Sequence, residues 1–144
     1  MTGAGEFRQA CAGRLWSLMS WEQLAAFWQR IDAAAGWYLY AVGEPPPSAP
    51  ADAARVVEFL RRIDELLRRD HREDYCGIVY ADDITRPRLV KIYDPNNLGS
   101  SCGSSRHPPL PGWIMSRMPP EDLAPPRPAP EGRRRWWRAL HQPD

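Results

Sequence analysis

The stretch Tyr75–Tyr93, YCGIVYADDITRPRLVKIY, decides the fold class of this chain. Residues 75–81 and 88–93 are short runs rich in Ile, Val and Tyr, which is typical of β-strands. Only the six residues DDITRP separate the two runs. Because a parallel pair needs a crossover of a dozen or more residues, the stretch predicts an antiparallel hairpin with the aspartates in its turn.

Amphipathic helices are predicted on the N-terminal side of this hairpin. The apolar residues Leu24, Phe27, Trp28 and Ile31 recur at i, i+3, i+4 and i+7. They predict a helix over residues 20–35, and Ser20 with Gln23 forms a capping box at its start. A similar stripe predicts a helix over residues 50–70, and looser helical spacing indicates an earlier one over residues 5–18.

Two further strands complete the predicted body. Residues 37–42, WYLYAV, are aromatic and favour a strand, and residues 113–115 form a brief last one between prolines. We therefore expect an α+β domain over residues 1–118. It would consist of a small antiparallel sheet of three or four strands, packed by two or three helices.

The composition is that of a soluble globular protein. The 144 residues are 43% hydrophobic and 26% charged, and the formal net charge is +1. This balance disfavours nucleic acid as a partner. The longest uncharged stretch in the first half has 11 residues, so no membrane span is expected.

Arginine and cysteine usage indicates where the protein works. Arginine outnumbers lysine 18 to 1, which is typical of a bacterium with a high-GC genome. The three cysteines are odd in number and form no CxxC pair, which argues against a secreted disulfide scaffold. We expect a cytoplasmic protein.

The loop after the hairpin, Asn96–His107, is rich in Gly and Ser around one cysteine. Small residues expose backbone amides, which can stabilise a thiolate or an oxyanion. One alternative is therefore a thiol-dependent enzyme, with Cys102 as nucleophile and His107 as base. A further alternative is a structural zinc site formed by His71, Cys76, Cys102 and His107, two thiolates and two imidazoles. The leading interpretation needs no cofactor and treats this loop as a binding surface.

The chain ends in a Pro-rich arm with a basic, aromatic tail. Nine prolines in the 23 residues 108–130 predict an extended C-terminal arm over residues 119–144. Trp and Arg dominate protein–protein hot spots, so we expect the tail to bind another protein; docking on its own domain is the alternative. The expected contact residues are Asn96, Asn97, Cys102, Arg133, Arg134, Arg135, Trp136, Trp137 and Arg138.

No complete catalytic constellation is present in the sequence. The leading hypothesis is therefore a non-catalytic accessory protein, namely an assembly factor, a subunit or a regulator. It would bind a larger protein partner through its arm and the Gly/Ser/Cys loop, and a homo-oligomer is a further alternative.

Overall fold

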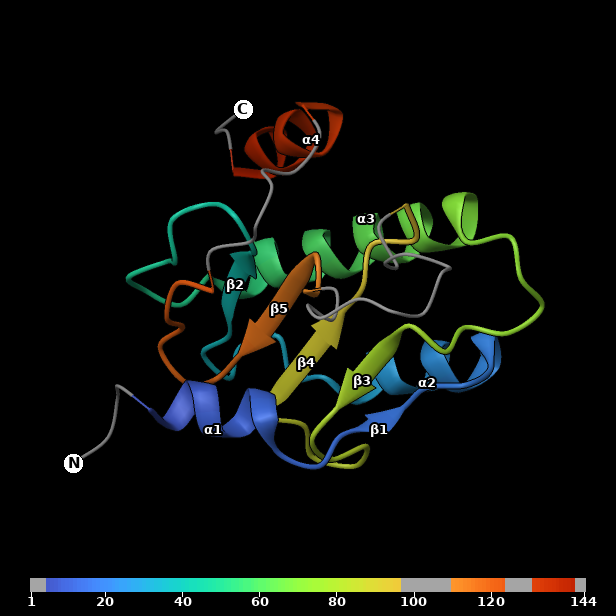
Figure 1. Cartoon of the computed structure of the whole chain (residues 1–144), viewed down its shortest axis with the longest axis horizontal. Helices are drawn as coiled ribbons and strands as arrows, with labels where there is room; N and C mark the ends of the chain where they lie inside the picture. The colour runs from blue at the N-terminus through green and yellow to red at the C-terminus, as the bar shows by residue number, and fades with distance from the viewer. Residues whose placement is uncertain (1–4, 97–109, 124–130, 142–144) are drawn as a thin grey trace, which may run out of the picture.

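An antiparallel sheet is the centre of the fold. The computed structural model describes residues 5–96, 110–123 and 131–141. It confirms the α+β class: helices pack on a five-stranded sheet of order β1-β3-β4-β5-β2, in which every neighbouring pair is antiparallel (Figure 1). The elements in chain order are α1 (Glu6–Ala12), β1 (Trp16–Ser17), α2 (Trp21–Arg30), β2 (Tyr38–Ala41), α3 (Ala53–Asp70), β3 (Val79–Ala81), β4 (Leu89–Ile92), β5 (Trp113–Ser116) and α4 (Glu131–His141).

The predicted hairpin is present, because β3 pairs with β4 in antiparallel register. The Oδ1 atom of Asp82 accepts hydrogen bonds from the backbone amides of Arg88 and Leu89, at 2.9 and 3.0 Å. Asp83 accepts two more from amides inside the turn. Both aspartates therefore satisfy backbone donors of the turn, as the sequence predicts.

The sheet buries a different hydrophobic cluster on each face. α2 and α3 cover one face and α1 covers the other (Figure 1). The pleat sends alternate residues to opposite faces, so Leu39 and Ala41 join the cluster beneath α2 and α3. Tyr40 and Val42 join the cluster beneath α1, where Phe7 is fully buried.

Side-chain caps fix where α2 and α3 begin. The Ser20 hydroxyl accepts a hydrogen bond from the Gln23 amide at 2.9 Å, as a capping box requires. The Gln23 side chain reaches back one residue further than predicted and accepts from the amide of Met19. At α3, the Asp52 carboxylate accepts from the amide of Arg55 at 2.8 Å.

α2 ends at Arg30, whereas the sequence predicts a helix to residue 35. The carboxylate of Asp32 accepts a hydrogen bond from the amide of Ala34 at 3.0 Å, and its carbonyl accepts from the indole N–H of Trp37 at 2.9 Å. Gly36 has a φ of 93°, a left-handed conformation that glycine adopts without strain. These contacts turn the chain from α2 into β2.

The first helix is also shorter than predicted. α1 ends at Ala12, and Trp16–Ser17 pair with the edge of β3 instead of continuing the helix to residue 18. Gly13 ends the helix with an extended conformation, ψ −171°. The sheet therefore gains a strand, because the unpaired edge of β3 supplies hydrogen-bonding partners that the local sequence does not reveal.

The described residues beyond 118 pack on the rest of the chain. The carboxylate of Glu121 accepts a hydrogen bond from the Gly5 amide at 2.7 Å, and the Leu123 amide donates to the Tyr40 hydroxyl at 2.8 Å. Residues 131–141 differ from the predicted extended arm, because they form α4, which lies beside α3 (Figure 1). Pro125, Pro126, Pro128 and Pro130 of the predicted arm lie outside the described residues.

Candidate functional site

One stripe of α4 faces the body of the protein. It consists of Arg133, Trp136, Trp137 and Leu140, which recur at i, i+3, i+4 and i+7. Trp136 packs edge-on against Trp113 of β5, with ring centroids 5.5 Å apart. Trp137 packs against Phe59 of α3 at 6.2 Å. Leu140 completes the contact and is only 6% exposed, so α4 is attached through large apolar side chains.

Arg133 forms the polar end of this stripe. Its Nε and Nη2 atoms donate to both carboxylate oxygens of Asp94 at 2.9 and 3.1 Å, and Nη2 also donates to Asp70 at 2.7 Å. The three side chains are only 10–17% exposed. Hydrogen bonds from Arg69 and then Arg133 lower the pKa of Asp70 to about 2. The N-terminal half of α4 is therefore held by a nearly buried ion network.

Asp94 joins α4 to the start of the predicted binding loop. Its Oδ1 atom accepts a hydrogen bond from the backbone amide of the exposed Asn96 at 2.9 Å. Gly112, at the far side of residues 97–109, packs closely on it: a Cβ at Gly112 would lie 3.2 Å from the Cβ of Asp94. Asn96, the first residue of the predicted loop, and Gly112 therefore both contact the carboxylate-bearing residue that binds Arg133. Asn97 and Cys102 lie outside the described residues, as does His107.

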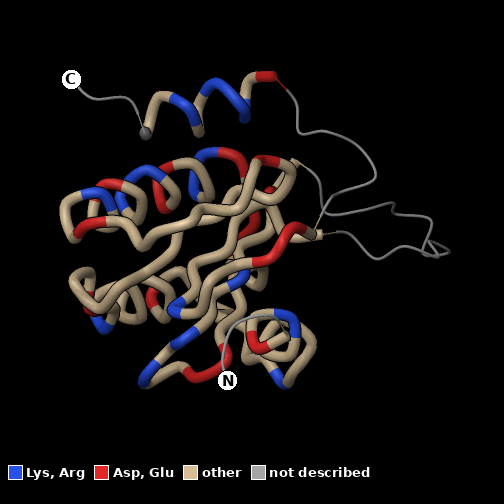
Figure 2. Tube along the Cα trace, turned by 90° about the vertical axis from the view of Figure 1, so that its left-hand side faces the viewer, with Lys and Arg blue, Asp and Glu red and all other residues tan. Residues whose placement is uncertain are grey.

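The outer side of α4 is basic. The helix carries four arginines against one glutamate, and basic positions follow its length in Figure 2. Arg135 and Arg138 are exposed, and among the described residues the ion pair of Arg138 is a solvent-exposed one with Glu131 at 3.5 Å. Arg134 is tethered to Glu44 at 3.4 Å. Of the described residues expected to bind a partner, Asn96, Arg135 and Arg138 are exposed, whereas Arg133, Trp136 and Trp137 contact other parts of their own chain.

The two described members of the proposed zinc site lie close together but are already engaged. The Nε2 atom of His71 is 2.9 Å from the backbone carbonyl oxygen of Cys76. Cys76 is fully buried, and this burial raises the pKa of its thiol, whereas zinc binds the thiolate. Within the described ranges no three His, Cys, Asp or Glu side chains form a metal-binding group. Because Cys102 and His107 lie outside those ranges, the zinc and thiol-enzyme alternatives stay predictions.

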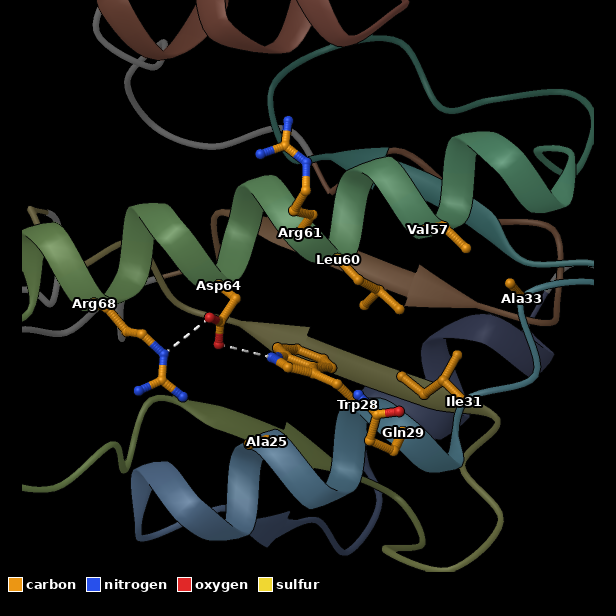
Figure 3. Close-up of a pocket in the computed structure, with 10 residues that line it drawn as sticks. All are labelled: Ala25, Trp28, Gln29, Ile31, Ala33, Val57, Leu60, Arg61, Asp64 and Arg68. Carbon is orange, nitrogen blue, oxygen red and sulfur yellow. Dashed lines mark hydrogen bonds and ion pairs between the residues drawn. The ribbon is translucent and has the colours of Figure 1, made fainter.

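A groove of about 440 Å³ separates α2 from α3 (Figure 3). The indole N–H of Trp28 donates to one Asp64 oxygen at 3.1 Å, and Arg68 donates to the other at 2.9 Å. The apolar side chains of Leu60 and Val57 line the groove further along α3. The groove offers apolar contact area, and the dashed contacts in Figure 3 show that Asp64 is already paired.

Sequence reasoning missed the carboxylates that hold α4. Asp70 lies at the end of the predicted helix over residues 50–70 and Asp94 just before the predicted loop, and neither position indicates a distant partner. The signal that could have revealed α4 is the spacing of Arg133, Trp136 and Leu140. No such signal points to Asp70 or Asp94, because they lie 63 and 39 residues from Arg133 in the sequence.

Comparisons with known proteins add no relative: no protein-family model, no curated protein and no solved structure matches this chain. Among the helices in the described part of the chain, none combines the length and apolar character that crossing a bilayer requires. Functional inference therefore rests on the geometry of the site itself.

Proposed function

We propose that this protein is a non-catalytic accessory protein, an assembly factor, a subunit or a regulator, that binds a larger protein partner. Its binding surface combines the exposed arginines of α4, Arg135 and Arg138, with the predicted loop that begins at Asn96. We call this the composite surface. The partner would present an acidic face to it, because the exposed side of α4 carries an excess of positive charge.

The observation that supports the proposal is the contact between Arg133 and Asp94. It supports a surface shared by the two segments that the sequence singles out, because Arg133 of the basic tail and Asn96, where the loop begins, bind the same carboxylate. Trp136 and Trp137 then have a defined role, which is to attach α4 so that Arg135 and Arg138 face solvent. A helix that is already attached to its own domain loses less entropy on binding than an extended arm would. The free thiols of Cys11 and Cys76 support a reducing, cytoplasmic location.

Charge reversal on α4 tests the proposal. Tagged full-length protein, the double variant R135E/R138E and the control R86E/R117E are used to recover partners from lysates of the source cells, after nuclease treatment. All four arginines are exposed, and the two pairs lie at opposite ends of the sheet. We expect wild type and the control to recover the same partner protein in a stoichiometric amount. R135E/R138E should recover at least about tenfold less of that partner.

Three outcomes contradict the proposal. Equal recovery of the same protein by all three forms would show that the basic face of α4 is not the contact surface. Loss of all binding after nuclease treatment would assign α4 to nucleic acid instead. Recovery of the tagged wild-type chain with no second protein bound would show that it has no larger partner in these cells. Circular dichroism of each variant shows whether it is folded before its recovery is compared.

A further inference from the structure

A pocket of about 340 Å³ lies at the end of the sheet opposite α4. Its walls come from the turn after α2, the turn between β3 and β4, and the residue that follows β5. Trp113, which contacts α4, pairs with Ile92 at one end of β4, whereas Ser116 pairs with Leu89 at the other. The length of the sheet therefore separates this pocket from α4, and the inference is independent of the proposed function.

The pocket has an excess of positive charge. Four arginines line it, Arg30, Arg86, Arg88 and Arg117, and Asp32 is the one acidic residue among the lining side chains. Their formal charges sum to +3. The Asp32 carboxylate also accepts the Ala34 amide at 3.0 Å, so it takes part in ending α2 and is not free to neutralise the arginines alone.

Internal contacts leave most of this charge uncompensated. Arg88 approaches Glu6 at 3.5 Å, and both side chains are well exposed, 57% and 38%, so this pair contributes little. Arg30 reaches only a backbone carbonyl, that of Ile84, at 3.5 Å. Within the described part of the chain, neither Arg86 nor Arg117 forms an ion pair, although Asp83 lies near Arg86: backbone hydrogen bonds from Arg86 and Thr85, and then the Arg86 charge, lower the pKa of Asp83. Several arginine side chains around one pocket repel each other, and a bound anion would reduce that repulsion.

The floor of the pocket is apolar. Trp37 is 2% exposed and Ile31 is 9% exposed, and the buried Pro87 lies beside them in the lining. The indole N–H of Trp37 is already donated to the Asp32 carbonyl at 2.9 Å. The indole therefore has no hydrogen-bond donor left for a ligand, and an apolar group is the chemistry that complements this floor.

We propose that this pocket binds a small organic phosphate monoester. The phosphate would lie between Arg86 and Arg117, and the apolar part of the ligand would pack toward Trp37 and Ile31. A phosphate monoester carries close to two negative charges at pH 7, which matches the charge excess better than a monocarboxylate does. Guanidinium groups bind phosphate oxygens through paired hydrogen bonds. The volume is in the range of small-molecule sites.

Calorimetric titration of the full-length protein tests the proposal, with phenyl phosphate as the probe and inorganic phosphate and benzoate for comparison. We expect one phenyl phosphate per chain, with a Kd of about 1 mM or lower that rises with salt. Inorganic phosphate and benzoate should each bind more weakly, because one lacks the apolar part and the other the second charge. The variant R86Q/R117Q should lose at least about tenfold in affinity.

The matched control is R135Q/R138Q, which removes two exposed arginines from α4 and should change the affinity less than about twofold. If R86Q/R117Q and R135Q/R138Q lose the same affinity for phenyl phosphate, the anion is attracted to arginine nonspecifically and the proposal is overturned. Equal affinity for inorganic and phenyl phosphate, or no binding of phenyl phosphate, would overturn it as well. Circular dichroism checks folding, and R117Q alone replaces the double variant if that variant unfolds.

Discussion

The guanidinium of Arg133 binds both carboxylate oxygens of Asp94, across 39 residues of sequence, at 2.9 and 3.1 Å. This contact fixes α4 against the point where β4 has ended and the predicted binding loop begins. Asp70 at the end of α3 binds the same guanidinium at 2.7 Å. One arginine thus joins three segments, and the position of α4 depends on it.

Arg133→Gln should loosen α4. The variant leaves the nearly buried Asp94 without its charged partner and Asp70 with Arg69 alone, at a cost of about 1–3 kcal/mol in the free energy that holds α4 on the body. Backbone amides of residues 131–141 should then exchange with deuterium at least about fivefold faster. Hydrogen-exchange mass spectrometry of the peptides that cover α4 measures this.

Arg135→Gln is the control for that experiment. Arg135 lies on the same helix and is exposed, so its removal deletes the same charge without breaking the contact with Asp94. The backbone amides of α4 in this variant should exchange with deuterium at the same rates as in wild type. Equal acceleration in both variants would show that net charge, and not the ion network, governs the attachment of α4.

Asp70→Asn should make stability less dependent on acid pH. The folded-state pKa of Asp70 is lowered to about 2, first by Arg69 and then by Arg133, from an ordinary value of 3.8. A carboxyl with a lowered folded-state pKa stabilises the fold above its unfolded-state pKa, and this contribution disappears as pH falls through the folded-state value. At pH 7 the variant should be less stable by about 1–2 kcal/mol, and the difference should shrink between pH 4 and about 2.

Urea unfolding at several pH values tests this expectation. Comparison with wild type at each pH cancels the contribution of other acidic groups with low pKa values, such as Glu58. Asp74→Asn, at an exposed position, should stay within about 0.5 kcal/mol of wild type throughout. A difference for Asp70→Asn that persists unchanged down to pH 2 would rule out the ion network as its origin.

Trp136→Ala should destabilise the protein more than Trp16→Ala. Trp136 is half-buried and packs on Trp113 at 5.5 Å, so truncation removes apolar contact between α4 and the sheet and should cost about 1–3 kcal/mol. Trp16 is 51% exposed, and its removal should cost under about 1 kcal/mol. Urea unfolding followed by circular dichroism compares them. Equal unfolding free energies would mean that α4 contributes nothing through Trp136.

The elements that could be predicted from the sequence are those whose signal is local. The hairpin follows from two β-favouring runs and a six-residue connection, and α2 and α3 follow from apolar periodicity. Ser20 caps α2 as predicted because a capping contact spans only three residues. The early end of α2 was missed because Asp32 ends it through its own side-chain and carbonyl contacts, which apolar periodicity does not report.

The elements that could not be predicted depend on distant partners. Trp16–Ser17 are a strand only because β3 offers its edge: their partners Ala81 and Tyr80 lie 65 and 63 residues further along the chain. α4 has a readable stripe, but its partners Phe59 and Trp113 belong to other elements, and the preceding prolines favour an extended arm. The arginine pocket likewise draws Arg30, Arg86 and Arg117 from three separate segments, so no single stretch carries its signal.

Cys76 should resist alkylation in the folded protein. It is fully buried and its thiol pKa is raised by that burial, so little reactive thiolate forms and the reagent has no access. We expect iodoacetamide to modify Cys76 at least about a hundredfold more slowly in buffer than in urea, as peptide mass spectrometry can measure. Comparable rates in both solvents would contradict its burial.

The same peptide digest measures the alkylation of Cys102 as a function of pH. A pH midpoint of its alkylation rate well below the ordinary thiol pKa of about 8.5, which His107→Gln then raises, would favour the thiol-dependent enzyme over the accessory protein.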